Sequence, residues 1–235
     1  MPVPGQTPDE LSALESAAER GLATPRAAGV AGIIFAALFV LALLFLRQGM
    51  GRGLDTETVL RNVTGSGSTL ALAGLYLVPF AGIAFLWFMA VVRDRIGERE
   101  DKFFATVFLG SGLLFVAMLF AAAAVLGGLV AGYRFGTATP TDLATVGFAR
   151  SVGYSLLFVY GAKVAGVFTL ATSNIMRRSG WPRWTSVSGF ATALVLILSI
   201  TFFEPIVMLF AVWVAAISLY VLVTGGKQAP GGTGL

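Results

Sequence analysis

The sequence predicts an all-α protein, a polytopic transmembrane helical bundle with six spans. Hydrophobic residues make up 57% of the 235 residues and charged residues only 12%, about half of the ~25% that a typical soluble domain carries. The apolar residues are also gathered into long runs. Because a helix rises 1.5 Å per residue, runs of about 20 residues match a hydrocarbon core of ~30 Å.

The predicted spans follow one another with short polar junctions. The last two come from one apolar run, residues 187–223, which is too long for a single span. We divide it at Phe203-Glu204-Pro205, because proline fits the first turn of a helix and disfavours helix in the residue before it. The six spans are then residues 28–46, 69–92, 103–131, 150–176, 187–203 and 205–223.

Three further expectations concern the parts around these spans. Pro79 removes a backbone donor inside the second span and predicts a kink there. Residues 47–68, rich in glycine, threonine and serine, are expected to form a loop. The domains are then 1–27, a cytoplasmic segment with a short amphipathic helix, 28–224, the transmembrane domain, and 225–235, a disordered tail.

The distribution of basic residues predicts the orientation. With the amino terminus inside, the cytoplasmic segments hold ten basic residues and the outer segments hold five, namely Arg47, Arg52, Arg61, Arg134 and Arg150. Cytoplasmic loops of membrane proteins carry an excess of lysine and arginine. Both termini are therefore expected in the cytoplasm.

The composition removes several kinds of chemistry. The chain has no cysteine and no histidine, so thiol chemistry, imidazole metal ligation and histidine acid–base catalysis are excluded. No glycine-rich phosphate loop, nucleophile elbow or pair of catalytic carboxylates is found in the sequence. We therefore predict no catalytic residue, no metal, no cofactor and no nucleic-acid partner.

Lys163 is the one charge well inside a predicted span. It lies 13 residues from Arg150 and 14 from Arg177, close to the middle of the membrane. A lysine at the centre of a spanning helix costs about 2.5–3.5 kcal/mol on insertion scales. Lys163 could bind an anion or orient a substrate. The alternative is a lysine hydrogen-bonded to helix carbonyls or to Tyr160, one turn earlier.

Two other residues complete this candidate binding site, Tyr160 and Glu204. Glu204 lies near the bilayer between spans five and six and is the candidate carboxylate partner of Lys163. Its alternative role is a helix N-cap beside Pro205, where the helix dipole favours a carboxylate. Thr169 and Ser173 share a face turned away from Lys163, and we expect their hydroxyls to bond to carbonyls of their own helix.

Pairs of small residues recur at a spacing of four, which lets helix backbones approach closely. We expect these pairs to pack within the bundle, with self-association as the second possibility. The pairs are Gly161/Ala165, Ala162/Gly166, Ala124/Gly128 and Gly128/Gly132.

Two junctions carry a resemblance to a known group of proteins. They are FLWFMAVVRDRIGEREDKFFATVFLGSGLLF at residues 85–115 and RRSGWPRWTSVSGF at residues 177–190. In these junctions and in the layout of residues 28–224, the chain resembles bacterial six-span integral membrane proteins of unknown function. The resemblance implies a compact six-helix bundle in a bacterial inner (plasma) membrane.

The sequence leaves three hypotheses for the function, each of a different class. The first is a non-enzymatic accessory, scaffold or regulatory subunit, with the lipid bilayer around it and a protein partner or a second copy on a small-residue face. The alternative is a small-solute or ion transporter with Lys163 in its pathway, and a membrane enzyme is third. A transporter needs water at Lys163 for part of its cycle, whereas a scaffold does not.

Overall fold

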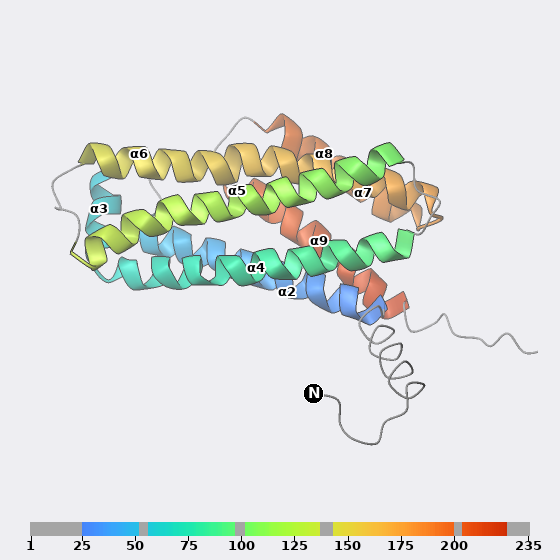
Figure 1. The fold of residues 1–235 in the computed structure, drawn as a ribbon, viewed down its shortest axis with the longest axis horizontal. Coiled ribbons are helices and arrows are strands. Elements are labelled where there is room, and N and C mark those ends of the chain that lie inside the picture. Colours follow the sequence, from blue (N-terminus) through green and yellow to red (C-terminus); the bar gives the residue numbers. More distant parts are fainter. Residues whose placement is uncertain (1–24, 52–55, 97–101, 137–142, 200–203, 225–235) are drawn as a thin grey trace, which may run out of the picture.

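The computed structural model describes residues 25–51, 56–96, 102–136, 143–199 and 204–224, and its regular elements are all helices. The predicted all-α fold is therefore confirmed. Figure 1 shows the long helices side by side along one axis, with α3 lying across one end. The helices are α2 (Pro25–Met50), α3 (Thr56–Thr64), α4 (Gly67–Ile96), α5 (Lys102–Arg134), α6 (Leu143–Tyr154), the π-helix η1 (Ser155–Gly161), α7 (Ala162–Arg178), α8 (Arg183–Leu198) and α9 (Glu204–Thr224).

Five helical segments are long and apolar enough to cross a membrane, so the chain is a multi-pass helical membrane protein. The segments are Gly29–Met50, Gly67–Ala90, Phe103–Arg134, Leu143–Arg178 and Pro205–Thr224. The predicted fifth span corresponds to α8, a shorter apolar helix of 16 residues. At 1.5 Å per residue α8 is about 24 Å long, less than the ~30 Å of a hydrocarbon core. The predicted helix within residues 1–27 and the disordered tail fall on residues 1–24 and 225–235, which lie outside the described part.

The prediction that residues 47–68 form a loop is wrong. Helix α2 continues to Met50, α4 already begins at Gly67, and α3 lies between them. Val59 and Val63, one turn apart on α3, are both buried against the end of the bundle. These two valines, with the partly buried Leu60, dock this short helix. Their neighbours in the same apolar cluster include Leu46, Leu75, Leu126, Val130 and Val146.

The fourth span is longer than predicted and is not a regular α-helix throughout. It begins at Leu143, and α6, η1 and α7 follow one another without a break. Residues 143–149, which precede the predicted span 150–176, are therefore helical as well. Pro79 lies inside α4, which is one helix from Gly67 to Ile96.

Phenylalanine side chains fill the centre of the bundle. Phe85 is fully buried, and its ring centroid lies 4.9 Å from that of Phe35 and 5.1 Å from that of Phe168. Phe115 and Phe210 lie 5.2 Å and 5.8 Å from the same ring. These five rings, which we call the phenylalanine cluster, come from α2, α4, α5, α7 and α9. They join five helices at one point.

Glycine lets α2 and α4 approach backbone to backbone. A Cβ on Gly67 would lie 2.5 Å from the Gly49 carbonyl oxygen, and one on Gly74 would lie 2.8 Å from the Ala42 oxygen. Both contacts are with backbone atoms, which have no side-chain freedom to move away. By contrast, a Cβ on Gly128 of α5 would meet no atom within 4 Å. The expectation that Ala124/Gly128 packs within the bundle is therefore wrong, because this pair faces outward.

Candidate functional site

Helices α8 and α9 form a hairpin that extends only part of the way along the bundle (Figure 1). Helix α8 packs on α7, with Gly189 against Ser173 and Gly166 against Ile197. Helix α9 packs on α2, where the rings of Phe210 and Phe35 lie 5.9 Å apart. Both helices occupy the half of the bundle away from α3. The hairpin tip, by which we mean the end of α8 at Leu198 and its C-cap Ser199, therefore lies partway along the bundle, and Leu198 is exposed there.

Lys163 binds the end of α8 at this tip. Its Nζ donates a hydrogen bond to the Ser199 carbonyl oxygen at 3.0 Å. Ser199 is the C-cap of α8, and its backbone turns to an extended conformation with φ −64° and ψ 126°. The last carbonyls of a helix have no partner within it and carry the negative end of its dipole. An ammonium group satisfies both needs where no water is at hand.

The other two predicted site residues are placed differently. Tyr160 is 58% exposed on the outside of the bundle, and no hydrogen bond joins it to Lys163 among the described residues. Glu204 is the first residue of α9, but its side chain lies outside the described part. The structure therefore brings Lys163 to Ser199, which the sequence analysis did not name. A pairing of Lys163 with Glu204 stays a prediction.

The hydroxyls of α7 bond as expected from the sequence. Thr169 donates to the Ala165 oxygen at 2.8 Å, and Ser173 donates to the Thr169 oxygen at 2.7 Å. Thr172 donates to the oxygen of Phe168 at 2.7 Å in the same way. These hydroxyls are satisfied within α7, so they do not extend a polar path from Lys163.

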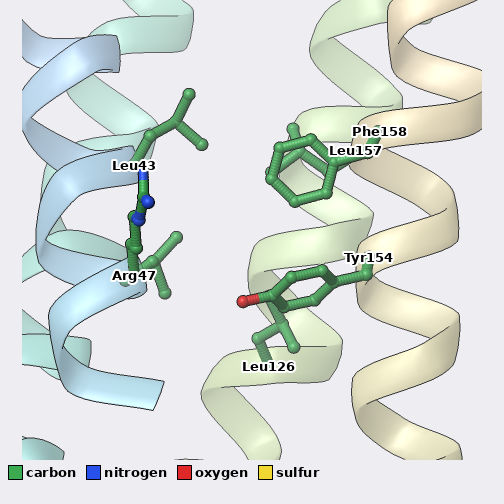
Figure 2. Close-up of a pocket in the computed structure, with 7 residues that line it drawn as sticks. Leu43, Arg47, Leu126, Tyr154, Leu157 and Phe158 are labelled. Atoms are coloured by element: carbon green, nitrogen blue, oxygen red, sulfur yellow. The ribbon is translucent and has the colours of Figure 1, made fainter. Parts of the chain in front are cut away.

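A second candidate site lies between α2 and the α6–η1 segment, in the half of the bundle nearer α3. Figure 2 shows Arg47 and Leu43 on one wall, facing Tyr154, Leu157 and Phe158 on the other. The hydroxyl of Tyr154 points across the gap toward α2. The pocket therefore has a basic and a hydroxyl group at one end and hydrocarbon along the rest.

Arg150, one turn before Tyr154 on α6, lies against the ring of Tyr154. It is only 8% exposed, and its guanidinium carbon lies 4.9 Å from the centroid of the Tyr154 ring. A guanidinium at this distance is attracted to the face of an aromatic ring. From the sequence, Arg47 and Arg150 were expected only to contribute to the orientation in the membrane. Arg47 lies four residues after Leu43, and Arg150 lies four residues before Tyr154. This spacing places each pair on one face of its helix, and it was the signal that could have placed the two arginines.

Comparison with known proteins and the ligand chemistry of the described residues add no assignment. No group of three acidic side chains in the described part of the chain is placed to hold a metal ion. No family model, curated protein or solved structure matches the chain. The fold defines the class, a multi-pass helical membrane protein, and the function is argued from geometry.

Proposed function

We propose that this protein is a non-enzymatic membrane subunit that acts as an accessory, scaffold or regulatory component through contacts with other membrane proteins. The observation that carries this proposal is the bond between Lys163 and the Ser199 carbonyl. It gives Lys163 a structural role, which is to bind the end of a helix that stops partway along the bundle.

Lys163 is half-buried, at the edge of a packed interior. Its neighbours on α7, Ala162 and Ala165, are buried, and so is Phe168 one turn further on. Phe168 belongs to the phenylalanine cluster, which occupies the middle of the bundle. A solute that moved along the bundle axis would have to displace these rings. Such packing favours a static role for Lys163 over a role in a transport pathway.

Helix α5 offers the surface where a partner is expected. Its exposed residues include small ones spaced by seven and four positions, so they share one side of the helix: Gly110, Ala117, Ala124 and Gly128. We call this side the α5 face. A Cβ on Gly110 or Gly128 would meet no atom within 4 Å. Small residues on an open face allow another spanning helix to approach closely.

The proposal includes the placement of the protein in its membrane. We infer that α8 completes a six-span arrangement, that the α3 end faces outward, and that both termini are cytoplasmic. The excess of basic residues on the opposite side supports this orientation. The resemblance to bacterial six-span proteins supports a bacterial inner membrane.

The first experiment measures whether water reaches Lys163 in the unaltered protein. The lysines of the chain are Lys102, Lys163 and Lys227, so a membrane-impermeant amine reagent followed by peptide mass spectrometry reports on each. We expect Lys102 and Lys227 to be modified in vesicles that expose the cytoplasmic side. Lys163 should react from neither side until detergent denatures the protein. Modification of Lys163 in the folded protein would support the transporter alternative instead.

The second experiment tests for a partner on the α5 face. A photo-crosslinking residue at Ala124 should give a discrete crosslinked protein band in native membranes. The same residue at Val212, which is exposed on α9, serves as the control and should give lipid adducts alone. Equal results at the two positions would contradict docking on the α5 face.

A further inference from the structure

We propose that the outer surface of the bundle at Lys163 binds a spanning helix of a partner protein that carries a glutamate or aspartate near the middle of the membrane. We call this surface the Lys163 face. It consists of Tyr160, Lys163, Val167 and Leu198, of which Lys163 is half-buried and the other three are exposed. The inference rests on the proposed function of a subunit that contacts membrane proteins, and it adds the chemistry of one partner.

The depth of Lys163 excludes a lipid head group as its partner. Lys163 lies 13 residues after Arg150 and 14 before Arg177, roughly 20 Å from each along the helix. At the centre of a hydrocarbon core of about 30 Å, the head groups are about 15 Å away on either side. The four-carbon stem of a lysine spans only part of that distance. A group that binds the ammonium from the outer side therefore belongs to a protein.

The charge of Lys163 is not neutralised by an acidic side chain in the described part of the chain. The one acidic side chain described there, that of Glu57, is on α3 at the end of the bundle. An ammonium group has three N–H donors, and the described residues accept one of them, at the Ser199 carbonyl oxygen. Ionisable residues within spanning helices pair with one another or with backbone carbonyls. Lys163 has the carbonyl and can still take a charged partner.

Tyr160 adds a second polar group on the same side of the bundle. It lies in the last turn of η1, three residues before Lys163, and residues three apart are neighbours on a helix surface. Its side chain is 58% exposed, and no residue in the described part accepts a hydrogen bond from its hydroxyl. Tyrosines that face lipid are usually found at the membrane interface, where the hydroxyl is wet. A phenol exposed at mid-membrane beside a lysine favours an acceptor on another chain.

A carboxylate is the acceptor that suits both side chains. It has two oxygens, so one can accept from the Lys163 ammonium and the other from the Tyr160 hydroxyl. Bonds between charged groups are shorter and stronger than those between neutral ones. An amide or a hydroxyl of the partner would also accept a hydrogen bond, but it would leave the charge of Lys163 uncompensated. The carboxylate, in turn, is costly to place in a membrane alone, so each helix neutralises the other.

The side chains around the two polar groups suit a spanning helix. Helix α8 ends at Leu198, so it does not cover η1 beyond the hairpin tip (Figure 1). Leu198 is 64% exposed at the tip, and Val167, one turn after Lys163 on α7, is 37% exposed. A helix that lay here would therefore place apolar residues on Val167 and Leu198 and its acid between them. Helices without a mid-membrane acid would gain only the apolar contacts.

The test measures how the full chain binds model spanning peptides in phosphatidylcholine vesicles. The chain has no cysteine, so Ser179→Cys, in the exposed turn after α7, can carry an energy-transfer dye. The peptides are leucine–alanine helices that differ only in a central glutamate or glutamine. The glutamate peptide should bind about fivefold more tightly than the glutamine peptide. This preference should fall below about twofold in Lys163→Met and should decrease in Tyr160→Phe. Tyr76→Phe is the matched control, because Tyr76 is 70% exposed on α4.

Each outcome decides the proposal. Equal binding of the two peptides would overturn it, and so would a preference that Lys163→Met leaves intact. If Lys163→Met unfolds more easily than the parent, Tyr160→Phe decides instead, and a preference equal to that of Tyr76→Phe would refute the proposal. A membrane-permeant carbodiimide, added without peptide, links an amine to an adjacent carboxylate. An amide between Lys163 and Glu204 would show that the chain's own acid takes this place, which would also overturn the proposal. None of these results depends on the α5 face, so failure here is distinct from failure of the proposed function.

Discussion

Replacing Phe85 with alanine tests whether packing holds this bundle together. Phe85 is fully buried at the centre of the phenylalanine cluster. Its ring centroid lies within 6.2 Å of five others, those of Phe35, Phe88, Phe115, Phe168 and Phe210. Removal of the ring leaves a cavity that these neighbours border from several helices at once.

A bilayer lowers the expected free-energy cost of Phe85→Ala relative to the same change in a soluble core. In a soluble core, Phe→Ala costs about 3–5 kcal/mol, which includes the transfer of the ring from water. In a bilayer that transfer term is small, because lipid is as apolar as the core. What remains is the loss of aromatic contacts worth about 0.5–1.5 kcal/mol each, which are not fully additive. We expect the Phe85→Ala variant to lose about 2–4 kcal/mol of unfolding free energy.

Phe80, on the same helix, is the matched control. Its side chain is 47% exposed, and its ring pairs with that of Tyr76 at 5.4 Å. Lipid can replace most of its contacts, so Phe80→Ala should cost less than about 1 kcal/mol. The assay is equilibrium unfolding in mixed micelles with increasing SDS, followed by the fluorescence of buried Trp213. Equal costs for the two variants would refute the argument that interior packing carries the stability.

Three further predictions use the same unfolding assay or hydrogen exchange. Gly67→Val places side-chain atoms against the backbone of α2 and should cost about 3 kcal/mol or more, whereas Gly128→Val should stay within about 0.5 kcal/mol; equal midpoints would contradict this. Lys163→Met loses a charged hydrogen bond worth about 1.5–3 kcal/mol but also the burial cost of about 2.5–3.5 kcal/mol. Its stability should therefore change by less than about 1 kcal/mol, and a much larger loss would contradict the cancellation. Val59→Asn buries an amide and should expose the amides of residues 56–64 to exchange, while exchange in α5 stays unchanged.

The helices that were predicted correctly are those whose apolar runs need no partner to be recognised. Length and hydropathy alone identify a spanning helix, because most residues that face lipid or core must be apolar. Helix α3 escaped prediction because its two buried valines have meaning only once the end of the bundle is there to receive them. The π-helix η1 also gave no signal, since its residues are ordinary for an apolar helix and its register is set by packing.

Candidate site residues were predicted less well for a related reason. The depth of Lys163 could be counted from the sequence, but its partner is a backbone carbonyl on another helix, and every residue has one. Spacing of small residues had the same weakness. Gly67 and Gly128 both belong to glycine-rich helices, yet one meets the backbone of α2 and the other meets no neighbour within the protein. Contacts between helices decide these roles.

The two halves of the bundle differ in what packs beside α2. In the half that contains Lys163, the α8–α9 hairpin occupies the space and the phenylalanine cluster closes the centre. In the other half α3 packs across the ends of α2, α4, α5 and α6, so it covers the bundle from the aqueous side.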